Sequence, residues 1–212
     1  MDPNILAAII GGASGVVGGV VGGVIAARAT QKSTREANAH ALQMQHAAQS
    51  ATVRGVLLGI RAEIVTLWDI YAAEFGVVLE ELSDGEAFWY HYPLHQNYFS
   101  VYESNAPLLG QIPDDSIRNA IVTTYLKGRG LIDSHLYNNQ LLEKHGALQR
   151  VRDETGSAKY AEQIDASLAN LNEYGTFIKQ SYFEMKVLVS DLTERIDAGV
   201  RLMEGQTNKL LP

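Results

Sequence analysis

The 212-residue chain is long enough for one membrane segment and a domain of about 160 residues, which is the division that we infer. Its formal net charge of -7 argues against a nucleic-acid partner, because binding a polyanion requires a basic face. The lack of cysteine excludes disulfide frameworks and thiolate metal sites and fits a cytosolic body.

Residues 1–29 are predicted to form a transmembrane helix. The run from Ile5 to Ala27 contains no charged residue, and at about 1.5 Å per residue it extends about 34 Å, enough for the hydrocarbon core of a bilayer. Arg28, Lys32 and Arg35 follow the run. By the positive-inside rule, we expect a single-pass protein of the bacterial inner membrane with its N-terminus outside and its C-terminal domain in the cytoplasm.

A cleaved signal peptide is the alternative interpretation of the same segment. Ala27, Arg28 and Ala29 resemble a small-residue cleavage site. A signal peptide needs a positive beginning and a shorter apolar core, whereas Asp2 offsets the charge of the amino terminus here. The sequence therefore favours an anchor that is retained.

Seven glycines dominate the membrane segment: Gly11, Gly12, Gly15, Gly18, Gly19, Gly22 and Gly23. A rotation of 100° per residue places all seven within an arc of about 140°, whereas Val17 and Val20 fall outside it. Glycine is a poor helix former, but a glycine face allows close packing between membrane helices. Besides membrane lipid, we therefore expect another copy of the chain as partner. The wide arc suits a ring in which each helix contacts two neighbours; a plain anchor with incidental glycines is the alternative.

The chain beyond the membrane is predicted to be helical. Residues 30–54 carry only a thin stripe of alanines and Met44 and are expected to form a stalk helix, and residues 55–212 a cytosolic helical bundle. The first bundle helix has apolar residues at steps of three and four, namely Leu57, Ile60, Ile64, Leu67, Tyr71, Phe75, Val78 and Leu82. No convincing period-two pattern occurs, so the predicted class is all-α.

The connection 83–112 is rich in aromatic residues. Five of its side chains are candidates for a pocket that takes a small ligand or a partner peptide as a trigger: Trp89, His91, His95, Tyr98 and Tyr102. Lining of the core is the alternative role for these rings. His91 and His95 are four apart, but Pro93 between them disrupts the helical geometry that a metal would need, so we expect no metal and no cofactor.

Two further long helices are predicted after the connection. Pro113, Asp114 and Asp115 are typical of a helix start, and Gly146 offers a stop for that helix. The last helix is expected to begin near Gly156, with one apolar face comprising Tyr160, Ile164, Leu168, Leu171, Ile178, Met185, Leu192, Ile196 and Val200.

Arg129 and His135 form an Arg-x5-His element on the first of these helices. The element resembles the motif of HEPN ribonucleases, in which the arginine and histidine serve phosphodiester cleavage. Gly130 stands where that motif usually has a polar residue, and Arg35 with His40 forms a similar spacing on the stalk. A surface salt bridge of Arg129 is the alternative, and we expect no enzyme.

The stretch from Tyr98 to Asp133 resembles a pattern in small bacterial membrane proteins with one N-terminal transmembrane helix and a helical cytosolic domain. The layout also resembles the membrane accessory protein of type VI-B CRISPR systems, whose HEPN-like domain assembles as a ring. The resemblance implies antiviral defence by membrane disruption.

These features together predict a homo-oligomeric inner-membrane protein that forms a ring or pore and permeabilises or depolarises the membrane, and the resemblance implies a role as an antiphage defence effector. A non-conducting scaffold for a cytosolic protein partner and a membrane-anchored HEPN-type ribonuclease are the alternatives.

Overall fold

The computed structural model describes the backbone of residues 3–93 and 98–210 and the side chains of residues 30–93 and 98–205. It divides into two compact units, Met1–Ala51 and Thr52–Pro212. Every regular element in the described backbone is helical, which confirms the predicted all-α class.

The first unit contains the first part of helix α1 (Pro3–Tyr71), and the remaining turns of this helix belong to the second unit. Residues 30–51 are exposed throughout, including Met44 at 61% and Leu42 at 56%. The membrane segment Ile5–Ala27 is helical, but its side chains, including those around the seven glycines, lie outside the described residues. Within the part of the chain that the structure describes, no helix combines the length and the apolar character needed to cross a bilayer.

In the second unit, α1 runs into a π-helical turn, η1 (Ala72–Gly76), and then into α2 (Val77–Glu81). The helical path therefore continues almost to Ser83. Most residues of the apolar face predicted for the first bundle helix are buried, namely Leu57, Ile60, Ile64, Tyr71, Phe75 and Leu82. Leu67 and Val78 are partly buried and pack against that core.

The connection after α2 contains a short helix, α3 (Ser100–Asn105), and a 3-10 turn, η2 (Ala106–Gln111). Its earlier part is irregular and lies against α5. A Cβ added at Gly175 would lie 2.2 Å from the carbonyl oxygen of Glu86, and the amide of Gly85 donates to Thr176 Oγ1 at 3.0 Å. Gly85 has φ 79°, a conformation that glycine adopts without strain. The backbone of the connection is thus held directly on a helix surface.

Helix α4 (Asp115–Thr155) begins where the sequence predicts and ends later. The Asp114 carboxylate accepts hydrogen bonds from the amides of Ser116 (2.7 Å) and Ile117 (3.4 Å), as an N-cap does. The predicted stop at Gly146 is wrong, since the helix continues to Thr155. Gly156 ends it in the left-handed conformation, φ 62°, with its amide donating to the carbonyl of Arg152.

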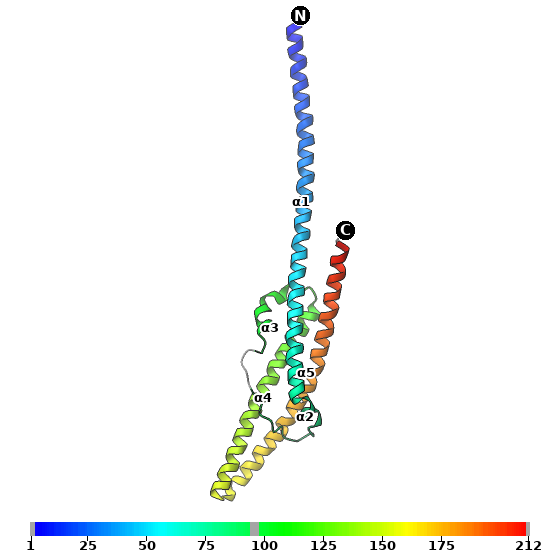
Figure 1. Cartoon of the computed structure of the whole chain (residues 1–212). Coiled ribbons are helices and arrows are strands. Elements are labelled where there is room, and N and C mark those ends of the chain that lie inside the picture. Colours follow the sequence, from blue (N-terminus) through cyan, green and yellow to red (C-terminus); the bar gives the residue numbers. More distant parts are fainter. Residues whose placement is uncertain (1–2, 94–97, 211–212) are drawn as a thin grey trace. The chain divides into compact units, whose positions relative to one another are not determined.

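Helix α5 (Ala161–Leu210) follows a 3-10 turn, η3 (Ala158–Tyr160), close to the predicted start. Figure 1 shows α4 and α5 side by side, with the end of α1 against them. Arg61 of α1 donates from Nε and Nη2 to Asp197 of α5 at 2.6 and 3.0 Å. The buried face of α5 matches the prediction at most positions, among them Ile164, Leu171, Ile178, Met185, Leu192, Ile196 and Val200.

Candidate functional site

A cavity of about 270 Å³ lies inside the second unit, between α1, the connection, α4 and α5. Its volume is close to the lower end of the range of small-molecule sites, about 300–1,000 Å³. Aliphatic side chains such as Ile64, Leu131 and Val189 form part of the wall. Five aromatic rings form much of the rest: Trp68, Tyr71, Tyr92, Tyr98 and Phe99.

The π-helical turn η1 brings a carboxyl group to this cavity. Glu74 lies within the turn, is exposed to solvent, and lines the cavity beside the rings. The negative charge of Glu74 contributes to raising the pKa of Tyr92, after burial and the interactions with Tyr98, and both side chains line the cavity. π-helical turns interrupt the α-helical phase and are frequent at functional sites. The turn thus places an acid at the edge of an aromatic enclosure.

His135 forms the most enclosed part of the wall. Its side chain is 1% exposed, its Nε2 lies 2.7 Å from the hydroxyl of Tyr71, and its ring stacks on Tyr92 at 4.7 Å. Burial lowers the pKa of His135 to about 4, so the imidazole is neutral at pH 7. Its Nδ1 has no hydrogen-bond partner among the residues whose side chains are described.

Tyr71 and Tyr92 are also neutral at pH 7. Burial, followed by the neighbouring phenols of Tyr92 and Tyr182, raises the pKa of Tyr71 far above its usual value. Burial is likewise the main cause of the raised pKa of Tyr92. Within the described lining, Glu74 is the only aspartate, glutamate, lysine or arginine.

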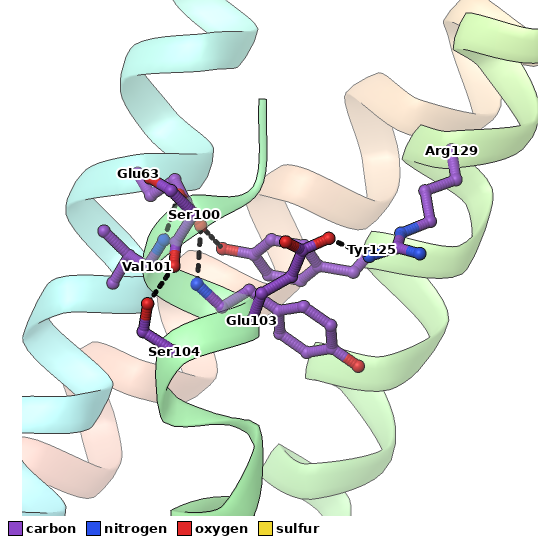
Figure 2. Close-up of polar contacts among 8 residues, drawn as sticks. Glu63, Ser100, Val101, Glu103, Ser104, Tyr125 and Arg129 are labelled. Carbon is purple, nitrogen blue, oxygen red and sulfur yellow. Dashed lines mark hydrogen bonds and ion pairs between the residues drawn. The ribbon is translucent and has the colours of Figure 1, made fainter. Parts of the chain in front are cut away.

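Two rings of the cavity, Tyr98 and Phe99, directly precede α3, and the position of α3 depends on Glu63 of α1 (Figure 2). The Glu63 carboxylate accepts hydrogen bonds from the amides of Val101 (2.6 Å) and Tyr102 (3.0 Å) and from the Tyr125 hydroxyl (2.9 Å). The residue before α3, Phe99, supplies no side-chain cap, so a carboxylate from another helix satisfies the first amides. This contact holds Phe99 against α1 and α4.

Figure 2 also shows Arg129, which lies outside the cavity lining. Its guanidinium donates to the Glu103 carboxylate at 2.6 Å and lies 5.9 Å from the centre of the Phe99 ring. Six residues along an α-helix separate Arg129 from His135 by about 120° in direction. Arg129 is half-exposed and ion-paired, whereas His135 is enclosed, so the structure brings the two residues to no common surface.

The five predicted pocket residues have different surroundings. Tyr98 lines the cavity, and its hydroxyl donates to the carbonyl of Pro93 at 3.2 Å. Tyr102 instead stacks on Tyr125 at 4.1 Å, and Trp89, 52% exposed, lies 5.6 Å from the His145 ring. His91 is exposed.

His95 lies outside the described residues, so its predicted place in the pocket stays a prediction. Among the side chains of residues 30–93 and 98–205, no group of three or more histidines and acids could hold a metal ion.

Sequence reasoning missed most of the cavity wall. Tyr71 follows the core periodicity of α1, Glu74 lies off that face, and His135 was assigned to a possible ribonuclease motif. A signal was present in the aromatic residues at Trp68, Tyr71 and Tyr92, but they are separated in the sequence and only the fold brings them together.

Comparisons of the chain with models of known protein families, with curated proteins and with solved structures gave no match.

Proposed function

We propose that the chain is a membrane-anchored homo-oligomer whose helical domain binds a small ligand and controls permeabilisation of the membrane. In this proposal Ile5–Ala27 spans the bacterial inner membrane once, and Arg28 and the basic residues after it hold the C-terminal side in the cytoplasm. The observation that carries it is the glycine arc within an uncharged run long enough to span a bilayer.

Self-association follows from the packing of such a helix. A lone glycine-rich helix gains little free energy from insertion into the bilayer, because glycine contributes little to the free energy of transfer from water and is a poor helix former. Close approach of two glycine faces compensates through van der Waals contacts and weak Cα–H hydrogen bonds. An arc of about 140° allows each helix to contact two neighbours, so a ring is the assembly proposed.

The ligand-binding part of the proposal rests on the cavity. It is lined by residues from four segments, and the buried imidazole of His135 in its wall has a ring nitrogen without a protein partner among the described side chains. Helix α1 contains both the proposed membrane segment and the cavity residues Trp68 and Tyr71, so one continuous element carries both functions. A ligand that binds one assembled state more tightly would shift the population toward it.

The absence of cysteine gives a direct test of the glycine interface, since single-cysteine variants have no background. Gly15 lies at the centre of the arc and Val17 on the opposite side. Under copper-phenanthroline oxidation in isolated membranes, Gly15→Cys should form a disulfide-linked dimer and Val17→Cys should not. Equal cross-linking of both variants, or of neither, would contradict the proposal.

Permeabilisation needs its own experiment. Recording from the purified full chain in a planar bilayer should show discrete conductance steps, and Gly15→Leu should abolish them. Steps that persist in Gly15→Leu would show that the glycine face does not build the conducting assembly.

A second candidate, a non-conducting scaffold for a cytosolic protein, is favoured by large apolar side chains exposed on the bundle. Leu126 of α4 and Val187 of α5 are 67% and 68% exposed. Such side chains can bind a partner protein. Co-purification of one stoichiometric protein, lost on Leu126→Ser with Val187→Ser while the membrane stays polarised, would favour this candidate over conduction.

A further inference from the structure

The cavity combines aromatic faces with one negative charge. Its five rings come from α1 and the connection, and in the described part of the chain the lining contains one acidic side chain, Glu74, no lysine or arginine, and the neutral imidazole of His135. The face of an aromatic ring is electron-rich and attracts a cation, most strongly when water is excluded. We propose that the cavity binds a small organic cation of the alkylammonium type, with its charge among the rings and facing Glu74.

Charge complementarity argues against an anionic ligand. An acid in the cavity would approach Glu74 and the negative faces of Trp68 and Tyr92 and would find no basic side chain in the lining to pair with. Arg129, the cation next to the ring of Phe99, is already paired with Glu103 at 2.6 Å and does not line the cavity.

The second nearby cation is also neutralised. Lys186 lies 5.9 Å from the centre of the Tyr182 ring, but its ammonium donates to Glu80 at 2.7 Å. Neither ion pair leaves a cation directed into the cavity, so a cationic ligand would meet no repulsive partner among the lining residues.

A wholly apolar ligand would fit the aliphatic part of the wall but would leave the polar features unused. Glu74 is at the solvent-exposed edge, where a cation can approach it without burying an unpaired carboxylate. The volume of about 270 Å³ limits the ligand to a compact molecule. A trimethylammonium or similar group on a short chain has the required size and charge.

Three probes of nearly the same shape separate charge from size: choline, its neutral carbon analogue 3,3-dimethylbutan-1-ol, and the anion 3,3-dimethylbutanoate. Each is titrated calorimetrically at pH 7 into the full chain in nanodiscs of phosphatidylglycerol, which contain no quaternary ammonium. We expect choline to bind about tenfold more tightly than the neutral analogue, as a desolvated cation–π contact implies, and the anion not to bind.

Glu74→Gln should lower the affinity for choline severalfold and leave that for the neutral analogue unchanged. The matched control is Asp69→Asn, which removes an exposed acid of α1 that does not line the cavity. A second variant, Trp68→Leu, removes one ring and should also weaken choline selectively. Circular dichroism spectra that match the wild type show that each variant is folded.

The proposal is overturned if the neutral analogue binds as tightly as choline, if the anion binds best, or if no probe binds a folded protein at millimolar concentration. It is equally overturned if Glu74→Gln and Asp69→Asn change choline binding to the same extent. Repeating the titration in phosphatidylcholine nanodiscs identifies the source of the cation. If the cavity takes the headgroup of a lipid, phosphatidylcholine competes and the affinity for choline falls. If the cavity takes a free cation, the affinity for choline is the same in both kinds of nanodisc.

The inference rests on the proposed function only in that the cavity takes a ligand. Oligomerisation through the glycine face is measured by cross-linking and mass, independently of these titrations. A failed titration with an intact oligomer therefore refutes the cation alone, and a monomer that binds choline refutes the assembly alone.

Discussion

The hydroxyl of Tyr71 and Nε2 of His135 lie 2.7 Å apart, and this hydrogen bond joins α1 to α4 at the wall of the cavity. The two rings also meet edge to face at 5.6 Å. Neither group carries charge at pH 7, since burial lowers the pKa of the histidine and raises that of the tyrosine. The contact therefore depends on a neutral imidazole.

This dependence predicts acid sensitivity. The pKa of His135 is about 4 in the folded protein and 6.5 in an unfolded chain, so between these values the unfolded state binds more protons. The stability that depends on a neutral His135 is fully present above pH 6.5 and is lost as the pH falls toward 4. In that range the free energy of unfolding decreases with a slope approaching about 1.4 kcal/mol per pH unit. Urea unfolding of the full chain in detergent at pH 7 and pH 5 measures the loss.

His135→Gln supplies the comparison for the acid effect. It keeps an amide that can bond to Tyr71 but removes the titration, so the difference in stability between pH 7 and pH 5 should shrink. His91→Gln, at an exposed position, should retain the wild-type difference. Two carboxyl groups also have lowered pKa values, Glu80 through its bond to Lys186 and Asp114 through its bond to Ser116. Their effect on stability falls at a more acid pH than the effect of His135. An unchanged difference in His135→Gln would refute the assignment.

Glu63→Ala should loosen α3. The substitution leaves the amides of Val101 and Tyr102 and the hydroxyl of Tyr125 without their acceptor. Loss of an acceptor from partly buried donors costs about 1–3 kcal/mol. Hydrogen exchange followed by mass spectrometry should show faster exchange in peptides covering residues 100–105.

Glu103→Ala is the matched control for the α3 prediction. It removes the half-exposed ion pair with Arg129, a kind of contact worth at most about 1 kcal/mol. Protection of the α3 amides should stay near the wild-type value. Equal exchange rates in the two variants would show that Glu63 does not hold the helix.

Gly175→Ala should destabilise the bundle, because the new methyl group would lie 2.2 Å from the carbonyl oxygen of Glu86. Overpacking of this kind costs about 1–3 kcal/mol. Gly130→Ala, in the interior of α4 with no atom within 4 Å of the added carbon, should instead stabilise by about 0.5–1 kcal/mol. Thermal unfolding of both variants tests the opposite signs, and a shift of the same sign would contradict the packing.

The helices could be predicted from the sequence because each carries a periodic apolar face. Leu57, Ile60 and Ile64 were predicted to be buried and are, and Asp114 was predicted near a helix start and caps one. Gly146 was a wrong stop signal, since a helix interior tolerates glycine at modest cost when its neighbours Leu141 and His145 are buried.

The cavity could not be predicted in the same way. Its walls come from four segments, and a periodic pattern shows which face of a helix is apolar but not which rings from distant segments meet there. The aromatic connection did indicate a pocket, and Tyr98 lies in it, but Tyr102 has its ring stacked on Tyr125 instead. The π-helical turn that presents Glu74 leaves no mark in the apolar periodicity of the sequence.

The most direct test of the account is the mass of the full chain, extracted in mild detergent and measured by light scattering after size exclusion. The account predicts a defined oligomer of the 23.2 kDa chain for the wild type and for Val17→Leu, and a monomer for the double variant with Gly15→Leu and Gly19→Leu. A monomeric wild type, or an oligomer unchanged by the two leucines, would contradict it.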